Sequence, residues 1–230
     1  MNCRIATTSN ISLLRDFVSK PTEEEWVYET LPPPSETKLF KILKDAYGDI
    51  QTLESIFEFA WIASSELGAW CANQVWALAL ADEAMPKLEG SIGKNADTDS
   101  QTSGRTLNEI KRVNEASQLI KDYLSDQAFE PMGLSSKVEL LLRKLSEQFS
   151  KWPNTKCIVF TERRNTAKVL LQLCKVRDIP NLRPDVLVGL RRGDAIGTNS
   201  TFRGQFLALI KFRKGEVNCL VSIIMASEHL

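Results

Sequence analysis

The sequence predicts an α/β protein in which an all-helical part precedes a partial parallel sheet. Three observations support this fold class. Apolar residues recur at helical spacing through most of the stretch from residue 36 to residue 151. Short apolar runs then alternate with helical segments from residue 156 onward, and such strand–helix units imply parallel pairing. The net charge of the 230 residues is zero, but the two signs of charge are separated along the chain.

The chain opens with a connecting segment, which we assign to residues 1–35. A short amphipathic helix is predicted over residues 11–20, and Pro21 prevents its continuation. Residues 25–30 could form a short strand before a stiff turn of three prolines. We expect this segment to lead into the main helical part of the chain.

Residues 36–133 are predicted to form a helical domain. Helices are expected from residue 36, over residues 51–66 and over residues 69–83, with Gly68 as the terminator between the last two. Three tryptophans follow one another closely and should be buried together, namely Trp61, Trp70 and Trp76. An aromatic ligand groove is the alternative to core packing.

A polar stretch interrupts this helical domain at residues 89–104. It is rich in glycine and has no apolar period, which predicts a flexible surface loop. Helical spacing resumes near Leu107 and ends at Pro131 and Gly133. The helical domain is therefore expected to consist of two parts joined by this loop.

Residues 134–230 are predicted to form the α/β part. Its first helix begins near Ser136, which has the spacing of a capping box with Glu139. The apolar stripe of this helix comprises Val138, Leu141, Leu142, Leu145 and Phe149. Strands are expected over residues 156–160, 184–189 and 218–222. The helices between them are marked by two apolar sets: Ala167, Leu170, Leu171 and Cys174, then Phe202, Phe206, Leu209 and Ile210.

The last predicted strand runs on toward residue 224, with little sequence after it. We therefore expect this strand to form an apolar edge of the sheet. Such an edge would lower both the solubility of the chain and the cooperativity of its unfolding.

Composition argues against several classes of protein. The five cysteines are widely spaced without a Cys-x-x-Cys pair, and the only histidine is His229, so a zinc site is not expected. The longest uncharged run, residues 67–81, contains Asn73 and Gln74 and is too short to span a bilayer. The N-terminus lacks a secretory apolar core. We expect an intracellular protein of the cytoplasm or nucleus with reduced, structural cysteines and no membrane partner.

The separation of charge divides the chain into an acidic and a basic half. Residues 22–99 carry 5 Lys and Arg against 15 Asp and Glu. Residues 156–214 carry 13 Lys and Arg against 4 Asp and Glu. A solvated basic face is the simplest explanation, but an excess of this size favours a polyanion as partner.

Polar and basic residues follow two of the predicted strands. Thr161, Arg163 and Arg164 come directly after the first strand, and Arg191 and Arg192 follow the second. The carboxyl ends of parallel strands lie next to helix N-termini, where backbone N–H groups, a hydroxyl and guanidinium groups can hold phosphates. We predict an RNA-backbone site here, with ion pairing or simple solvation of some arginines as the alternative.

Several motifs in this order resemble fungal Dicer-like proteins. CIVFTERRNTA and FRKGEVNCLV, with SSKVELLLRKL before them and the arginine pair after VLVG between them, resemble the C-terminal helicase lobe of that family. LLRDFVSKPTEEEWVY is similar to the stretch after its first motor lobe, and ELGAWCANQVWALAL to its helical insertion. The resemblance covers residues 13 to 221.

The resemblance implies a helical insertion followed by a partial RecA-like lobe. It implies that TERRNTA contacts the RNA backbone, which agrees with the independent choice of Thr161 and Arg163. The implied partners are double-stranded RNA and the first helicase lobe, and the implied role is RNA silencing and antiviral defence. In the full-length family, ATP and magnesium are the cofactors.

The chain lacks the residues that the family's chemistry needs. It has no GxxxxGK[ST] loop for a nucleotide, no Asp-Glu pair on a predicted strand to hold magnesium and no arginine finger. The acidic clusters of the RNase III domains are also absent. The sequence departs from the family motif from Ser222 onward, so the lobe reads as truncated. We therefore expect no catalytic residue, no metal and no cofactor of its own, and no hydrolysis of ATP, unwinding or cleavage by the chain alone.

Two other classes of function remain open. A dehydrogenase-type nucleotide-cofactor protein would need a glycine-rich turn after the first strand, where Thr161 to Arg163 stand instead. A non-catalytic interaction module would use the acidic helical part to bind a partner. A shortened or decayed gene product would also account for the altered end.

Overall fold

The structure is a computed structural model that describes residues 5–7, 33–82, 84–94, 100–125, 131–188 and 202–223. The chain divides into two compact units. One unit comprises residues 32–135 and 192–199, and the other comprises residues 1–31, 136–191 and 200–230. The helix predicted over residues 11–20 and the strand predicted over residues 25–30 lie outside the described residues.

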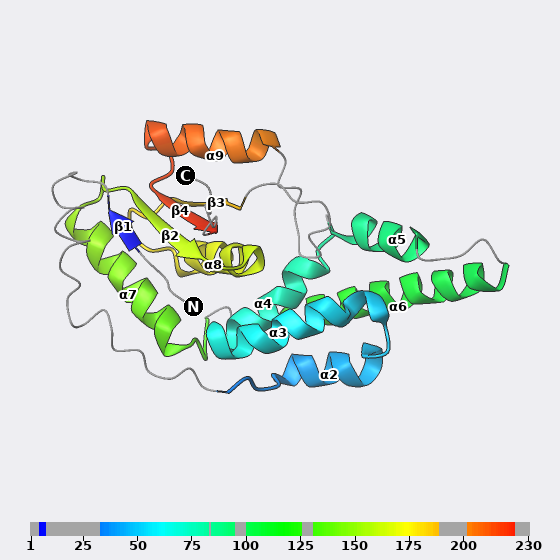
Figure 1. Cartoon of the computed structure of the whole chain (residues 1–230). Helices are drawn as coiled ribbons and strands as arrows, with labels where there is room; N and C mark the ends of the chain where they lie inside the picture. Colours follow the sequence, from blue (N-terminus) through cyan, green and yellow to red (C-terminus); the bar gives the residue numbers. More distant parts are fainter. Residues whose placement is uncertain are drawn as a thin grey trace. The chain divides into compact units, whose positions relative to one another are not determined.

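The first unit is helical (Figure 1). Its elements are α2 (Lys38–Tyr47), η2 (Gln51–Leu53), α3 (Glu54–Glu66), α4 (Ala69–Ala79), α5 (Met85–Lys94) and α6 (Ser100–Ser125). Thr37 begins α2 as its N-cap, since its hydroxyl accepts a bond of 3.1 Å from the backbone N–H of Phe40. The helices bury an apolar core that includes Leu39, Leu43, Leu53, Ile56, Val75 and Val113.

The predicted loop over residues 89–104 is wrong at both of its ends. Helix α5 continues to Lys94 and α6 already begins at Ser100. The apolar signal in this stretch is Leu88 and Ile92, which stand four residues apart and are both buried. Burial of that face outweighs the low helix propensity of the glycines around it.

The three tryptophans do not share one buried position. Trp76 is 1% exposed, whereas Trp61 is 38% exposed and Trp70 is half-buried. The Trp76 ring centroid lies 4.6 Å from that of Phe57 and 6.4 Å from that of Phe40. Of the three tryptophans, only Trp76 is fully buried as expected. Trp61 lies at the rim of this aromatic cluster.

The second unit contains the predicted parallel strands. Its elements are β1 (Ile5–Thr7), α7 (Ser136–Lys151), β2 (Cys157–Thr161), α8 (Arg164–Arg177), β3 (Pro184–Leu187), α9 (Phe202–Lys214) and β4 (Cys219–Ile223). The strand order is β1-β2-β4-β3, and β4 pairs in parallel with both β2 and β3. The predicted stripe of α7 is buried throughout. The predicted α/β fold class, a helical part followed by a partial parallel sheet, is confirmed.

The position of β4 corrects the expected apolar edge. Val221 of β4 has Val159 on one side and Val186 on the other, so both edges of β4 are paired. The last strand enters between the two earlier ones, and burial on both faces suits its apolar sequence. The described edges of the sheet are β3 and the antiparallel strand β1. Strand β1 was not predicted from the sequence, because three residues are too few to show a pattern.

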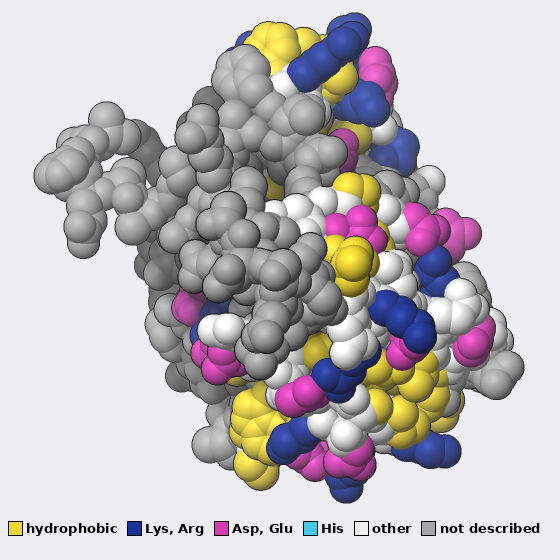
Figure 2. Space-filling model, turned by 90° about the vertical axis from the view of Figure 1, so that its right-hand side faces the viewer, with side chains coloured by type: hydrophobic (Ala, Val, Ile, Leu, Met, Phe, Trp, Pro, Cys, Tyr) yellow, Lys and Arg dark blue, Asp and Glu magenta, His cyan; other side chains and the backbone are white. Residues whose placement is uncertain are grey.

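Helix α9 also differs from expectation. Phe206 is 56% exposed, and Leu207 and Leu209 are exposed as well. Among the side chains of α9 that the structure describes, Ala208 is the buried one. Figure 2 shows hydrophobic and basic side chains together at the top, the height at which α9 lies in Figure 1. The predicted apolar stripe of this helix thus lies largely at the surface.

The four described cysteines, Cys71, Cys157, Cys174 and Cys219, are free and buried, as the sequence suggested. Burial raises the pKa of Cys174 to about 12, and the nearby Cys157 adds a smaller rise. Because the folded-state pKa is raised, this group stabilises the fold below its ordinary pKa of 9.0. That contribution is lost as the pH rises toward the folded-state value.

We predict that Cys174 resists alkylation in the native chain. The thiolate is the reactive form, so a pKa of about 12 leaves about one thiol in ten thousand ionised at pH 8. Iodoacetamide at pH 8 followed by peptide mass spectrometry should show Cys174 unmodified natively and modified in urea. Equal labelling rates in the two conditions would contradict this.

Within the described residues, no helix has the length and apolar character needed to cross a membrane.

Candidate nucleic-acid interface

The carboxyl ends of β2, β4 and β3 meet at one edge of the sheet. Thr161 pairs with Ile223 at the end of β2, and Leu187 pairs with Ser222 at the end of β3. The Ser222 hydroxyl donates to the Leu187 carbonyl at 2.8 Å, which fastens β4 to β3. This edge, which we call the carboxyl edge, is the predicted location of the RNA-backbone site.

Thr161 lies at this edge with its hydroxyl turned inward. Its side chain is buried, and Oγ1 lies 3.1 Å from the Arg163 carbonyl and 3.3 Å from the Ser222 carbonyl. The hydroxyl proton is therefore directed to protein acceptors. In this geometry Thr161 shapes the turn between β2 and α8 and joins it to β4.

Arg163 and Arg164 follow immediately at the start of α8. Arg163 is the N-cap residue, with extended backbone angles and no side-chain capping bond, and its side chain is exposed. Arg164 is the first helical residue and is half-buried. The structure thus brings two guanidinium-bearing residues to the positive end of a helix dipole, a place that favours anions.

Thr166 is a residue of this turn that the sequence analysis did not select. It is 0% exposed, and its Oγ1 has no hydrogen-bond partner. An unmatched buried hydroxyl costs about 1–3 kcal/mol, so such groups usually have a partner. The available signal was a threonine in the first turn of a helix that follows a strand.

Arg191 and Arg192 lie outside the described residues. Their assignment to the carboxyl edge remains a prediction from their position after β3.

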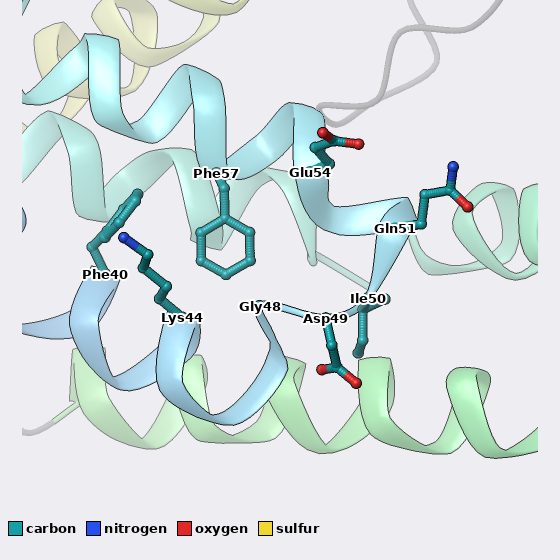
Figure 3. A pocket seen from close by; sticks show the side chains of 8 residues that line it. All are labelled: Phe40, Lys44, Gly48, Asp49, Ile50, Gln51, Glu54 and Phe57. Carbon is teal, nitrogen blue, oxygen red and sulfur yellow. The ribbon is translucent and has the colours of Figure 1, made fainter.

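A pocket in the helical unit is the second candidate site (Figure 3). Its lining residues are Phe40, Lys44, Gly48, Asp49, Ile50, Gln51, Glu54 and Phe57. The Lys44 ammonium bonds Glu36 at 2.8 Å, and both oxygens of Asp49 bond Arg112 at 2.6 Å. The bonds from Arg112 hold the pKa of Asp49 below its usual value.

These ion pairs leave the pocket poorly suited to a charged ligand. Arg112 also donates to the Ala46 carbonyl at 2.9 Å, so it joins α6 to the end of α2. In Figure 3 the Glu54 and Gln51 side chains point away from the ring of Phe57. We interpret the hollow as a packing feature beside the aromatic cluster rather than as the predicted alternative of an aromatic ligand groove.

No group of three or more His, Cys, Asp or Glu side chains that could hold a metal occurs within the described ranges.

Comparison with known proteins identifies the relatives of the chain. No family model matches it. Dicer-like protein 1 of Aspergillus fumigatus is 49% identical over 232 residues, a match that covers 100% of this chain and 15% of that protein. The chain is similar to Dicer-like protein 1 along its whole length. Dicer-like protein 1 of Phaeosphaeria nodorum is 35% identical over 235 residues with the same coverage.

The chain thus spans about 15% of the length of the curated relatives it matches. Similarity to Dicer-like proteins over the whole chain confirms the resemblance seen in the motifs. Among solved structures, the Hef helicase domain of Pyrococcus furiosus is 21% identical with a TM-score of 0.36. That match covers 82% of this chain and 34% of the Hef chain.

Proposed function

We propose that the Dicer-like chain binds the phosphate backbone of double-stranded RNA at its carboxyl edge. The observation that carries the proposal is the N-terminus of α8, where Arg163 and Arg164 follow the end of β2 after the single residue Glu162. Guanidinium groups and helix N-terminal amides are strong donors to phosphate oxygens. Contacts of this kind recognise the backbone and carry no base sequence.

Thr166 supports the same location. Its buried hydroxyl lacks a protein partner within the turn that carries the two arginines. Such a group is commonly completed by a ligand or an ordered water. In this proposal Thr161 positions the turn through its bonds to Arg163 and Ser222, while Arg191 and Arg192 contact phosphates after β3.

We further propose that the chain alone neither hydrolyses ATP nor unwinds or cuts RNA. The support is the sequence itself, which carries no nucleotide-cradling loop and no Asp-Glu pair on a predicted strand to hold magnesium. In a longer Dicer-like protein those groups would come from the first helicase lobe and from RNase III domains. The proposed role of this segment, within RNA silencing and antiviral defence, is to hold the duplex.

We predict that Arg163→Ala with Arg164→Ala weakens binding of a 20-base-pair RNA duplex at least tenfold in 50 mM salt. The slope of log affinity against log salt should also fall by about one to two, because each lost phosphate contact removes close to one released counterion. Fluorescence anisotropy across a salt series measures both quantities. The matched control is Arg143→Ala with Lys144→Ala, which removes two exposed charges from α7 in the same unit.

The Thr166→Val variant is a second test of the duplex site, because stability and RNA affinity can be measured separately. It removes the unmatched hydroxyl at nearly constant volume, so stability should stay level or rise by about 1 kcal/mol. RNA affinity should nevertheless fall. The proposal fails if the duplex does not bind at 50 mM salt, or if the control pair and the arginine pair lose equal affinity.

A further inference from the structure

The opposite, amino edge of the same sheet carries a second cluster of cations. Helices α7, α8 and α9 all end there, each followed by a loop that leads into a strand (Figure 1). We call this surface the basic pole. It comprises Lys151, Trp152, Lys156, Lys175, Arg177, Arg183, Lys211, Arg213 and Lys214.

Direct hydrogen bonds tie the loops of the basic pole together. Lys156 donates to the Arg213 carbonyl at 2.9 Å, and its ammonium lies 5.5 Å from the ring centroid of Phe212. Arg183 donates to the Gly215 and Glu216 carbonyls, each at 3.1 Å. Lys156 and Arg183 thus help to fix the end of α9. The other cations of the pole lie on loops and helix ends that these hydrogen bonds connect.

The other cations of the pole are directed to solvent. Lys151, Lys175, Lys211, Arg213 and Lys214 are all exposed. Within the described part of the chain, none of these five lies within ion-pair distance of a carboxylate. The loops of the pole contribute two acidic residues, Asp178 and Glu216.

Helix dipoles explain only part of this charge. A helix C-terminus carries about half a negative charge, so three of them favour a few nearby cations. The pole holds eight Lys and Arg residues, which leaves a clear positive excess after the three dipoles and two carboxylates. The surface therefore fits a polyanion.

Trp152 distinguishes between kinds of polyanion. Its side chain is 55% exposed, and the Lys151 ammonium lies 5.9 Å from its ring centroid. An exposed indole among cations is suited to stack a nucleic-acid base while lysines hold the neighbouring phosphates. A purely acidic peptide would not need the indole.

We propose that the basic pole binds single-stranded RNA, with a base stacked on Trp152 and phosphates held by Arg213, Lys214 and Lys151. This surface lies at the other end of the sheet from the proposed duplex site, and it does not depend on that site. The strands run between the two edges, so each can be altered separately.

The test uses the whole chain and a fluorescein-labelled 12-nucleotide oligouridylate in 50 mM salt. Arg213→Glu with Lys214→Glu should weaken binding at least tenfold, because it reverses two phosphate-facing charges. Trp152→Ala should weaken binding about fivefold or more, the effect of losing one stacked base. Trp152→Phe should restore most of the affinity, and each variant must keep the melting temperature of the parent chain.

Two outcomes would overturn the proposal. One is oligouridylate affinity that is unchanged in both the charge-reversal and the Trp152→Ala variants. The other is a competition result in which poly-L-glutamate displaces the labelled oligouridylate as well as RNA of equal charge does, while Trp152→Ala leaves the affinity unchanged. That result would assign the pole to an acidic protein segment. Binding of the RNA duplex distinguishes the two proposals. A loss of duplex affinity only in the Arg163→Ala and Arg164→Ala variant assigns the duplex to the carboxyl edge, and a loss only in the pole variants assigns it to the basic pole.

Discussion

Replacing Asn218 by alanine is expected to lower the free energy of unfolding of the α/β unit by about 2–4 kcal/mol. Asn218 is 1% exposed, and its Oδ1 accepts from the Arg183 backbone N–H at 2.7 Å. Its Nδ2 donates to the Asn181 carbonyl at 2.7 Å and lies 3.5 Å from the Pro153 carbonyl. Alanine would leave a backbone donor and an acceptor unmatched, each at a cost of about 1–3 kcal/mol.

The size of this effect follows from the place of Asn218 in the sheet. Its own backbone accepts from Cys157 and donates to Arg183, so one residue joins the loops before β2, β3 and β4. Removal of the side chain loosens all three loops at once. The basic pole is built on those loops, and its RNA affinity should fall along with stability.

Urea denaturation followed by circular dichroism measures the loss. Asn154→Ala is the matched control, because Asn154 is exposed in the loop before β2, and its replacement should change stability by less than about 0.5 kcal/mol. Asn218→Asp retains an acceptor for Arg183 but loses the donor to Asn181, so it should also destabilise. Equal stability of the Asn218→Ala and Asn154→Ala variants would refute the role of Asn218.

Gly68→Ala is expected to destabilise the helical unit by about 2–6 kcal/mol. Gly68 has a φ of +99°, and a Cβ there would lie 2.2 Å from the Gly133 carbonyl oxygen and 2.6 Å from the Leu134 Cα. An unfavourable backbone conformation costs about 1–3 kcal/mol, and overpacking adds a similar amount. The opposing atoms are backbone, so no side-chain rotation relieves the clash.

This close approach holds the corner between α3 and α4 against the segment that precedes α7. Ala69 N–H donates to the Gly133 carbonyl at 2.7 Å, and Ser135 N–H donates to the Leu67 carbonyl at 3.1 Å. The Ser135 hydroxyl also donates to the Glu66 carbonyl at 2.9 Å. Alanine at position 68 would push these two backbone segments apart and break the hydrogen bonds between them.

Gly90→Ala is the control for Gly68→Ala. Gly90 lies within α5, and a Cβ there would meet nothing within 4 Å. Alanine at such a helical position should raise stability by about 0.5–1 kcal/mol. The melting temperature should therefore fall in the Gly68→Ala variant and rise in the Gly90→Ala variant. A shift in the same direction would contradict the steric role of Gly68.

Local pattern was enough to predict most elements of the sheet unit. The parallel strands β2, β3 and β4 lie within about two residues of their predicted bounds, because short apolar runs bounded by turns carry a strong local signal. The stripe of α7 was predicted for the same reason. The sequence also placed Arg163 at the N-terminus of the following helix, since a strand, a turn and a helical period fix that position together.

Long-range partners were not predictable from pattern. The order of strands puts β4 in the interior, and no local feature of residues 219–223 indicates which neighbours it has. Strand β1 is recognisable only through its pairing with β2. Leu88 and Ile92 give α5 its buried face, although the composition around them favours a loop.

The sequence by itself determined the fold class, the basic character of the α/β unit and the Dicer-like relationship, because periodicity, charge and motifs are properties of local residue order. Tertiary structure alone decided what individual polar groups do. It turned the Thr161 hydroxyl toward protein carbonyls, left Thr166 without a partner and placed Asn218 among three loops. Hydrogen bonds depend on where distant backbone groups meet in space, and spacing along the chain does not encode that directly.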